Sequence, residues 1–215
     1  MAKKIEINAL QMIPKRPTLA MLHAAAAGCK ACDLWQHATQ TVFGEGPEHA
    51  RVMMIGEVPG DQEDRQGHPF VGPAGTLLDR ALSAAGIDRQ DVYVTNIVKH
   101  FKFEPRGKRR IHKKPNAVEI SACRPWLDAE LAVVRPEIVV LLGATAAESL
   151  LGRNFRVTQH RGQWLQSKIA PFVLATVHPS SILRAEDEQS RQQEMAQFIA
   201  DLRPVAEQLL RPAAA

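Results

Sequence analysis

The chain has 215 residues, 45% hydrophobic and 23% charged, a composition typical of a globular protein and not of a disordered or collagen-like one. We expect one α/β domain over residues 1–215, with its core at about residues 25–205. No apolar run reaches the roughly 20 residues of a membrane span, and the start of the chain lacks the apolar stretch of a secretory signal. We therefore expect a cytoplasmic protein without membrane contact.

The positive charge is concentrated in one segment. The formal net charge is +4, yet residues 99–114 carry eight Lys and Arg side chains against a single Glu, so the remainder of the chain is net negative. Such a concentration favours a polyanionic partner, because neutralising phosphates releases their counterions. The alternative interpretation is a solvated, flexible loop.

Strand-like and helical patterns alternate along the chain. Apolar, β-branched runs of strand length occur at residues 51–56, 92–98, 137–143 and 172–177. This alternation predicts a three-layer α/β/α sandwich with a central four-stranded parallel sheet. Ligands of such sheets bind beyond the carboxyl ends of the strands, so we expect the functional residues there. The helical patterns lie at residues 74–85, 116–134, 144–151 and 188–210.

The loops after the first and last strands contain residues suited to chemistry. Glu57 directly follows the first strand, where it could act as a base, and Gly56 and Gly60 allow the backbone to come close to a ligand. His178 follows the last strand, with a donor that could face developing negative charge. Downstream of the first loop, Phe70 lies between turn residues and could either stack on a planar ligand or pack against the next helix.

The three cysteines indicate a metal more than a disulfide. Cys29 and Cys32 have the two-residue spacing that lets two thiolates reach one metal, and Cys123 lies far along the chain. His100 is the best candidate for a fourth ligand, since imidazole can replace a thiolate on iron. Zinc is the chemical alternative, and an incidental pair with a buried Cys123 is the structural one.

The basic segment contains one histidine, His112, within residues 108–114. Several nearby cations disfavour its imidazolium form, so we expect a lowered pKa and a neutral ring at pH 7, the form that can act as a nucleophile. The alternative is an exposed histidine that contacts phosphate.

These motifs together resemble the uracil-DNA glycosylase superfamily, specifically its iron-sulfur-containing family four and the UdgX-type members within it. The similarity runs from about Cys29 to Arg184, and the segment that carries His112 resembles the feature that distinguishes UdgX-type members from hydrolytic ones. The motifs are residues 56–60, 69–75, 96–99, 108–112, 122–125 and 178–180.

The resemblance implies a uracil-binding site. Phe70 is then the stacking platform for a uracil flipped out of DNA, and Asn96 the amide that reads its Watson–Crick edge. Cytosine presents the opposite donor and acceptor at the corresponding positions and would leave this amide mispaired. The first loop completes the uracil site with Gly56, Gly60 and Asp61.

The resemblance also implies the chemistry. His178 would stabilise the departing uracil anion, Glu57 the cationic sugar, and His112 would capture C1′ of that sugar as a covalent adduct that does not turn over. Two alternatives stay open. One is a multiple-turnover hydrolytic glycosylase in which Glu57 activates water, and the other is a non-catalytic nucleic-acid-binding protein whose metal holds the fold.

The resemblance further implies a 4Fe-4S cluster, with zinc second, because His100 stands where the hydrolytic family has a cysteine. The partner implied is uracil-containing DNA, single- or double-stranded, with free uracil as product. The protein implied is a prokaryotic, cytoplasmic monomer that associates with the nucleoid during its action. Val58 departs from the pattern, since UdgX-type members have glutamine there and hydrolytic ones alanine. The implied cluster ligands are Cys29, Cys32, His100 and Cys123, and the implied DNA-binding residues are Lys99, Lys108, Arg109, Arg110, Ser180 and Arg184.

Overall fold

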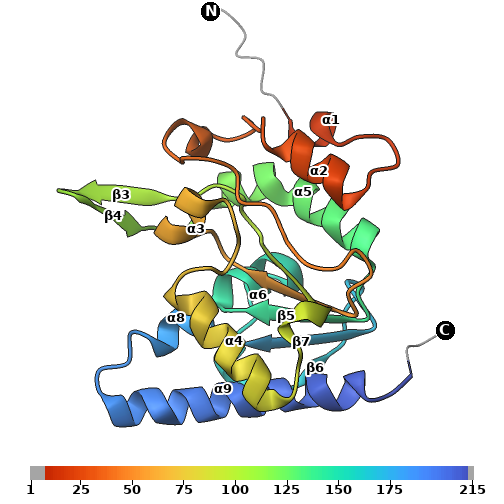
Figure 1. Cartoon of the computed structure of the whole chain (residues 1–215), viewed down its shortest axis with the longest axis vertical. Helices are drawn as coiled ribbons and strands as arrows, with labels where there is room; N and C mark the ends of the chain where they lie inside the picture. The colour runs from red at the N-terminus through yellow and green to blue at the C-terminus, as the bar shows by residue number, and fades with distance from the viewer. Residues whose placement is uncertain (1–7, 213–215) are drawn as a thin grey trace, which may run out of the picture.

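The computed structural model describes residues 8–212, in which helices pack on both sides of a central sheet (Figure 1). In chain order the elements are α1 (Ala9–Met12), α2 (Leu19–Ala26), the 3-10 helix η1 (Asp33–Gln36), β1 (Val52–Gly56), α3 (Asp61–Gln66), α4 (Pro73–Ala85), the 3-10 helix η2 (Arg89–Asp91), β2 (Val92–Asn96), β3 (Phe103–Arg106), β4 (Arg109–His112), α5 (Ala117–Val134), β5 (Ile138–Leu142), α6 (Ala144–Leu151), α7 (Val157–His160), β6 (Trp164–Leu165), β7 (Phe172–Thr176), α8 (Pro179–Ile182) and α9 (Glu188–Leu209).

The central sheet confirms the predicted α/β fold. Its strand order is β2-β1-β5-β7-β6, and the first four strands are parallel. Sequence patterns missed the fifth strand, β6, which is two residues long and pairs antiparallel with β7. The register places Gly56, the last residue of β1, beside Asn96, the last residue of β2. The loops predicted to be functional therefore leave the sheet at one edge.

The strands are buried on both faces, as their continuous apolar sequences predict. Met53 and Ile55 of β1 pack in the apolar cluster that α1, α2, α5 and α6 complete. The alternate residues Val52 and Met54 pack in a second cluster with α4, α8 and α9. Figure 1 shows these two helical layers on opposite sides of the sheet. Among residues 8–212, no helix combines the length and the apolarity needed to cross a membrane.

The basic segment forms an ordered hairpin, so the interpretation as a flexible loop is wrong. Strands β3 and β4 pair antiparallel, with Arg106 opposite Arg109 and Phe103 opposite His112. The two-residue turn between them starts at Gly107, whose φ of 59° is the positive value that tight hairpin turns require. The hairpin projects from the body of the molecule (Figure 1). It places His112 at the base of the projection, where β4 ends.

Candidate active site

Three side chains converge on Gly56 at the end of β1. A methyl group added at Gly56 would lie 2.4 Å from Asn96 Oδ1, 2.8 Å from Phe70 Cζ and 3.5 Å from His178 Nε2. The rings of Phe70 and His178 are stacked, with centroids 6.1 Å apart and an angle of 28° between their planes. The structure thus brings together an aromatic face, an amide and an imidazole from three segments that are far apart in the sequence.

The Phe70 loop is held in place by backbone constraints. Phe70 has a φ of 57°, the left-handed region, and a methyl group at Gly75 would lie 1.6 Å from the Phe70 carbonyl oxygen. Only glycine fits at position 75. The buried carboxylate of Glu63 accepts hydrogen bonds from the N–H groups of Gly60, at 3.1 Å, and Gly72, at 2.7 Å. Glu63 therefore ties the first loop to the Phe70 loop, a role that sequence analysis missed although its spacing from Gly60 is that of a helix cap.

The hydrogen bonds of His178 define its tautomer. The N–H of Ser180 donates to Nδ1 of His178 at 3.2 Å, so this nitrogen carries no proton. Burial lowers the pKa of His178 to about 4, with His112 and Arg184 as further causes. The neutral ring consequently carries its proton on Nε2, the atom that would lie 3.5 Å from a methyl group added at Gly56. Arg184 donates to Ser180 Oγ at 3.1 Å, which places both predicted DNA-binding residues of this loop beside the site.

His112 and Glu57 form a pair next to this cluster of side chains. Nε2 of His112 lies 3.9 Å from Oε1 of Glu57, and their side chains are 49% and 21% exposed. Burial lowers the pKa of His112, and Arg184 acts in the same direction, whereas the Glu57 charge opposes them. The sequence predicted this direction from the cations of the basic segment; the structure gives burial as the main cause.

Arg110 anchors the hairpin to α3. Its guanidinium forms ion pairs with Asp61 and, at 2.6 Å, with the fully buried Asp64. It also lies over the rings of Phe101 and Phe103, 5.3 and 5.1 Å from their centroids. Hydrogen bonds from Arg65 and Arg110 outweigh the cost of burial and lower the pKa of Asp61. Asp61 and Arg110 thus bind each other, and their predicted contacts with uracil and DNA stay predictions.

The other predicted DNA-binding residues separate into two groups. Lys108 and Arg109 are exposed at the turn of the hairpin, where a phosphate backbone can reach them. The Lys99 side chain is 1% exposed and pairs with the equally buried Glu130, so the prediction that Lys99 contacts DNA is wrong. The error came from treating residues 99–114 as one surface segment. Nothing in the spacing of Lys99 and Glu130 indicates that they meet.

Comparison with known proteins gives the family. The model of the uracil DNA glycosylase superfamily matches residues 43–203, most of the chain and all of the strands in the central sheet. The chain belongs to the uracil DNA glycosylase superfamily.

Curated members of this superfamily are similar over most of their length. A Type-4 uracil-DNA glycosylase of Thermotoga maritima is 39% identical over 167 residues, which cover 76% of this chain and 82% of the relative. One from Sulfurisphaera tokodaii is 39% identical over 163 residues, 72% of this chain and 71% of the relative. A Type-5 uracil-DNA glycosylase of Pyrobaculum aerophilum is 30% identical over 194 residues, 82% and 81% of the two chains.

In this superfamily member the three cysteines gather between the loop after α2 and helix α5. Trp126 Nε1 donates to Cys29 Sγ and the N–H of Lys99 to Cys123 Sγ, both at 3.2 Å. Burial raises the pKa of the Cys123 thiol to about 12, and Cys29 and Cys32 contribute to that rise. N–H donors to sulfur are the surroundings that iron–sulfur ligands use. Within residues 8–212, however, no three His, Cys, Asp or Glu side chains form a group that could hold a single metal ion.

His100, the predicted fourth ligand, is buried and neutral. Burial lowers its pKa to about 4. The Thr41 hydroxyl donates to the Ala26 carbonyl at 2.9 Å, so at 3.1 Å from His100 Nε2 it can only accept. The ring proton is therefore on Nε2, which leaves the Nδ1 lone pair for a ligand. The sulfur and nitrogen donors fit an iron–sulfur cluster in kind.

Val58 and Phe70 pack in different apolar clusters. Val58 is 6% exposed and packs in the apolar cluster on the α5 side of the sheet. The departure from the family pattern at this position therefore replaces a polar or small residue by a core residue.

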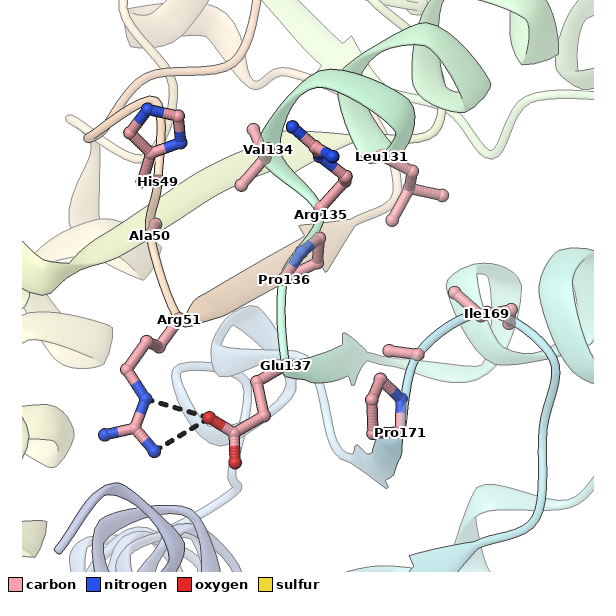
Figure 2. Close-up of a pocket in the computed structure, with 11 residues that line it drawn as sticks. His49, Ala50, Arg51, Leu131, Val134, Arg135, Pro136, Glu137, Ile169 and Pro171 are labelled. Carbon is pink, nitrogen blue, oxygen red and sulfur yellow. Dashed lines mark hydrogen bonds and ion pairs between the residues drawn. The ribbon is translucent and has the colours of Figure 1, made fainter. Parts of the chain in front are cut away.

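A separate cavity of about 520 Å³ lies at the opposite, amino end of the sheet (Figure 2). Arg51 and Glu137 face each other beside it, and Arg51 Nε donates to Glu137 at 2.8 Å. Arg51 also donates to the carbonyls of Leu209 and Arg211 at 2.9 and 3.0 Å, which ties the end of α9 to the sheet. None of the predicted site residues lines this cavity.

Proposed function

We propose that the protein is a uracil-DNA glycosylase that flips uracil out of DNA, breaks its glycosidic bond and captures the sugar on His112. The observation that carries this proposal is the convergence of Phe70, Asn96 and His178 on Gly56, with the His112–Glu57 pair beside it. The names of the Type-4 and Type-5 relatives support the substrate.

Recognition of uracil follows from the groups around Gly56. The ring of Phe70 offers a face on which the flipped base stacks, and the absence of a side chain at Gly56 lets Phe70 and the Asn96 amide come together there. The Asn96 amide donates to O4 of uracil and accepts from N3–H. Cytosine has a donor and an acceptor in the reverse order, so it would leave a buried amide unpaired. Gly60 leaves room for the Glu63 carboxylate, since a methyl group there would lie 2.6 Å from Glu63 Oε2.

Bond cleavage generates opposite charges that the site is built to accept. The bond between C1′ and N1 breaks with its electron pair on uracil, and the Nε2–H of neutral His178 donates to the developing anion. Because His178 is neutral, it stabilises the uracil anion through a hydrogen bond and keeps its proton while the bond between C1′ and N1 breaks. The sugar becomes cationic at C1′, where the carboxylate of Glu57 stabilises it. Uracil then leaves after taking a proton from solvent.

Capture requires a ring nitrogen with a free lone pair. Because burial lowers the pKa of His112, its ring is neutral at pH 7. Attack on C1′ forms one N–C bond and produces an alkylated imidazolium, which returns its remaining N–H proton to solvent. Nε2 lies 3.9 Å from Glu57, so the nucleophile and the group that stabilises the cation are neighbours. The product is a protein-DNA adduct.

A denaturing gel distinguishes the mechanisms. Incubation with uracil-containing single-stranded DNA should give a shifted band that survives heat and detergent, absent with thymine DNA and with His112→Ala. Free abasic product without a shift would instead indicate hydrolysis with Glu57 activating water. Uracil release of either kind excludes a non-catalytic binding protein.

We also propose that Cys29, Cys32, His100 and Cys123 hold a 4Fe-4S cluster. When bound, the cluster would supply structural cross-linking between the loop after α2 and helix α5, on the side from which the hairpin projects. Iron and acid-labile sulfide in the purified protein, with visible absorbance, support this assignment. Zinc in their place would contradict it, and an unchanged spectrum in His100→Ala would remove His100 from the ligand set.

A further inference from the structure

A buried ion pair between Lys99 and Glu130 lies beside the end of β2, and none of the proposed chemical steps uses it. The side chains of Lys99 and Glu130 are 1% and 0% exposed, and Nζ lies 2.5 Å from Oε2. A buried ion pair adds little net stability, because the cost of removing both charges from water offsets their attraction. Stability alone therefore does not account for a charge pair at this place.

The contacts of the ammonium connect it to the pocket. Besides Glu130, Nζ of Lys99 donates to Thr95 Oγ1 at 2.5 Å and to the main-chain carbonyl of Asn96 at 2.7 Å. An ammonium group has three protons, and three acceptors take them. The side chain of the same Asn96 lies against Gly56 in the base site. Lys99 thus holds the backbone of the residue that supplies the amide.

Glu130, the partner of Lys99, is itself held by several hydrogen bonds. It comes from α5, and its Oε1 accepts from the hydroxyl of Tyr93 at 2.9 Å and the N–H of Gly44 at 3.1 Å. Thr95 also donates to this carboxylate, at 2.9 Å. Each polar group named here has a partner, and such satisfied networks rigidify their surroundings. The network joins β2, the segment before β1 and helix α5 behind the pocket.

We propose that Lys99, together with Glu130, is a positioning residue for uracil recognition. The pair fixes the carbonyl of Asn96 and thereby the place of its amide, while neither side chain touches the base. The inference rests on the proposed function, since Asn96 reads uracil only if the pocket binds uracil. It assigns Lys99 a role inside the protein in place of the DNA contact that its sequence context suggested.

The test is the double variant Lys99→Met/Glu130→Gln. Met fills the volume of the lysine stem, and Gln still accepts from Tyr93 and donates to Thr95, so no charge is left unpaired. Free uracil is titrated into protein labelled with [15N]asparagine, whose side-chain amide signals come from Asn8, Asn96, Asn116 and Asn154 alone. We expect the Kd for uracil, and the DNA concentration that half-saturates single-turnover excision, to rise about tenfold, with a smaller change in the maximal single-turnover rate. The pH profile of excision and the visible absorbance should stay as in the wild type.

The matched control is Arg51→Met/Glu137→Gln, which removes an ion pair at the opposite end of the sheet. It should lower Tm without changing the Kd for uracil. An unchanged Kd in the Lys99/Glu130 variant, or an equal rise in the control, overturns the inference. If the Lys99/Glu130 variant does not fold, Thr95→Val removes only the bridging hydroxyl. A rise of about threefold in Kd then supports the inference, and no rise overturns it.

The wild-type protein distinguishes a failure of the proposed function from a failure of the positioning role. If it neither excises nor binds uracil, the proposed function fails and this inference fails with it. Normal excision by the wild type with unchanged uracil affinity in the variants overturns the positioning role alone.

Discussion

The substitution Gly56→Ala tests the base site at its centre. The added methyl carbon would lie 2.4 Å from Asn96 Oδ1, whereas ordinary contacts begin at 3.4 Å, so the amide must retreat by about 1 Å. A displacement of about 1 Å at a reacting site can reduce the rate roughly 100-fold, which corresponds to about 2.7 kcal/mol of transition-state stabilisation. We therefore expect the second-order rate constant of single-turnover uracil excision to fall about 100-fold. The assay is excision from a uracil-containing oligonucleotide over a range of DNA concentrations.

Gly28→Ala is the matched control for this prediction. A methyl group there would have its nearest neighbour, the Ala25 carbonyl oxygen, at 4.0 Å. Its second-order rate constant of single-turnover excision should stay within about twofold of the wild type. If Gly56→Ala excises uracil as fast as this control, the space beside Asn96, Phe70 and His178 is not where the base binds.

Three further predictions concern the hairpin and its histidine. Because burial places the pKa of His112 below 6.5, its neutral form persists as the pH falls through 6.5, and the rate of adduct formation should decline only below that value. A rate of adduct formation that has fallen to half at or above pH 6.5 would contradict this. Arg110→Gln should reduce adduct yield at least about tenfold at saturating DNA while uracil release continues, since it frees the hairpin from Asp64. An equal loss of adduct and of released uracil would indicate a general effect on folding. Arg109→Gln should instead lower the slope of log K against log salt by about one, measured by DNA-binding titration, and an unchanged slope would remove Arg109 from the DNA contacts.

The layered fold was predictable because its strands are buried on both faces. Continuous apolar runs such as residues 138–142 have few alternatives to a parallel strand between helices. The two-residue β6 carries no such signal. The hairpin was missed because the eight cations of residues 99–114 obscured a weaker pattern, in which Phe103 and Ile111 flank a glycine turn. Its order comes largely from tertiary contacts of Arg110, which local sequence does not reveal.

The loops that form the candidate site were predictable from the sequence, but the charged side chains that pair with each other were not. Residues at strand ends must meet at one edge of the sheet, which predicted that Glu57 and His178 lie together, whereas Asn96 was implied only by the family resemblance. Which charged groups pair inside the protein depends on three-dimensional packing. Lys99 and Arg110 were accordingly assigned to DNA, although their carboxylate partners lie on α5 and α3. The same limit applies to Glu63, which holds two loops together.

Capture of the sugar by His112 is the claim on which the mechanism depends most. After reaction with uracil-containing DNA, nuclease digestion followed by proteolysis and tandem mass spectrometry locates any residual deoxyribose on the chain. The mechanism predicts a peptide spanning His112 whose mass is increased by the abasic sugar and its phosphate, with fragment ions that assign the increase to the imidazole. An unmodified His112 peptide alongside stoichiometric uracil release, or the sugar attached to another residue, would contradict it.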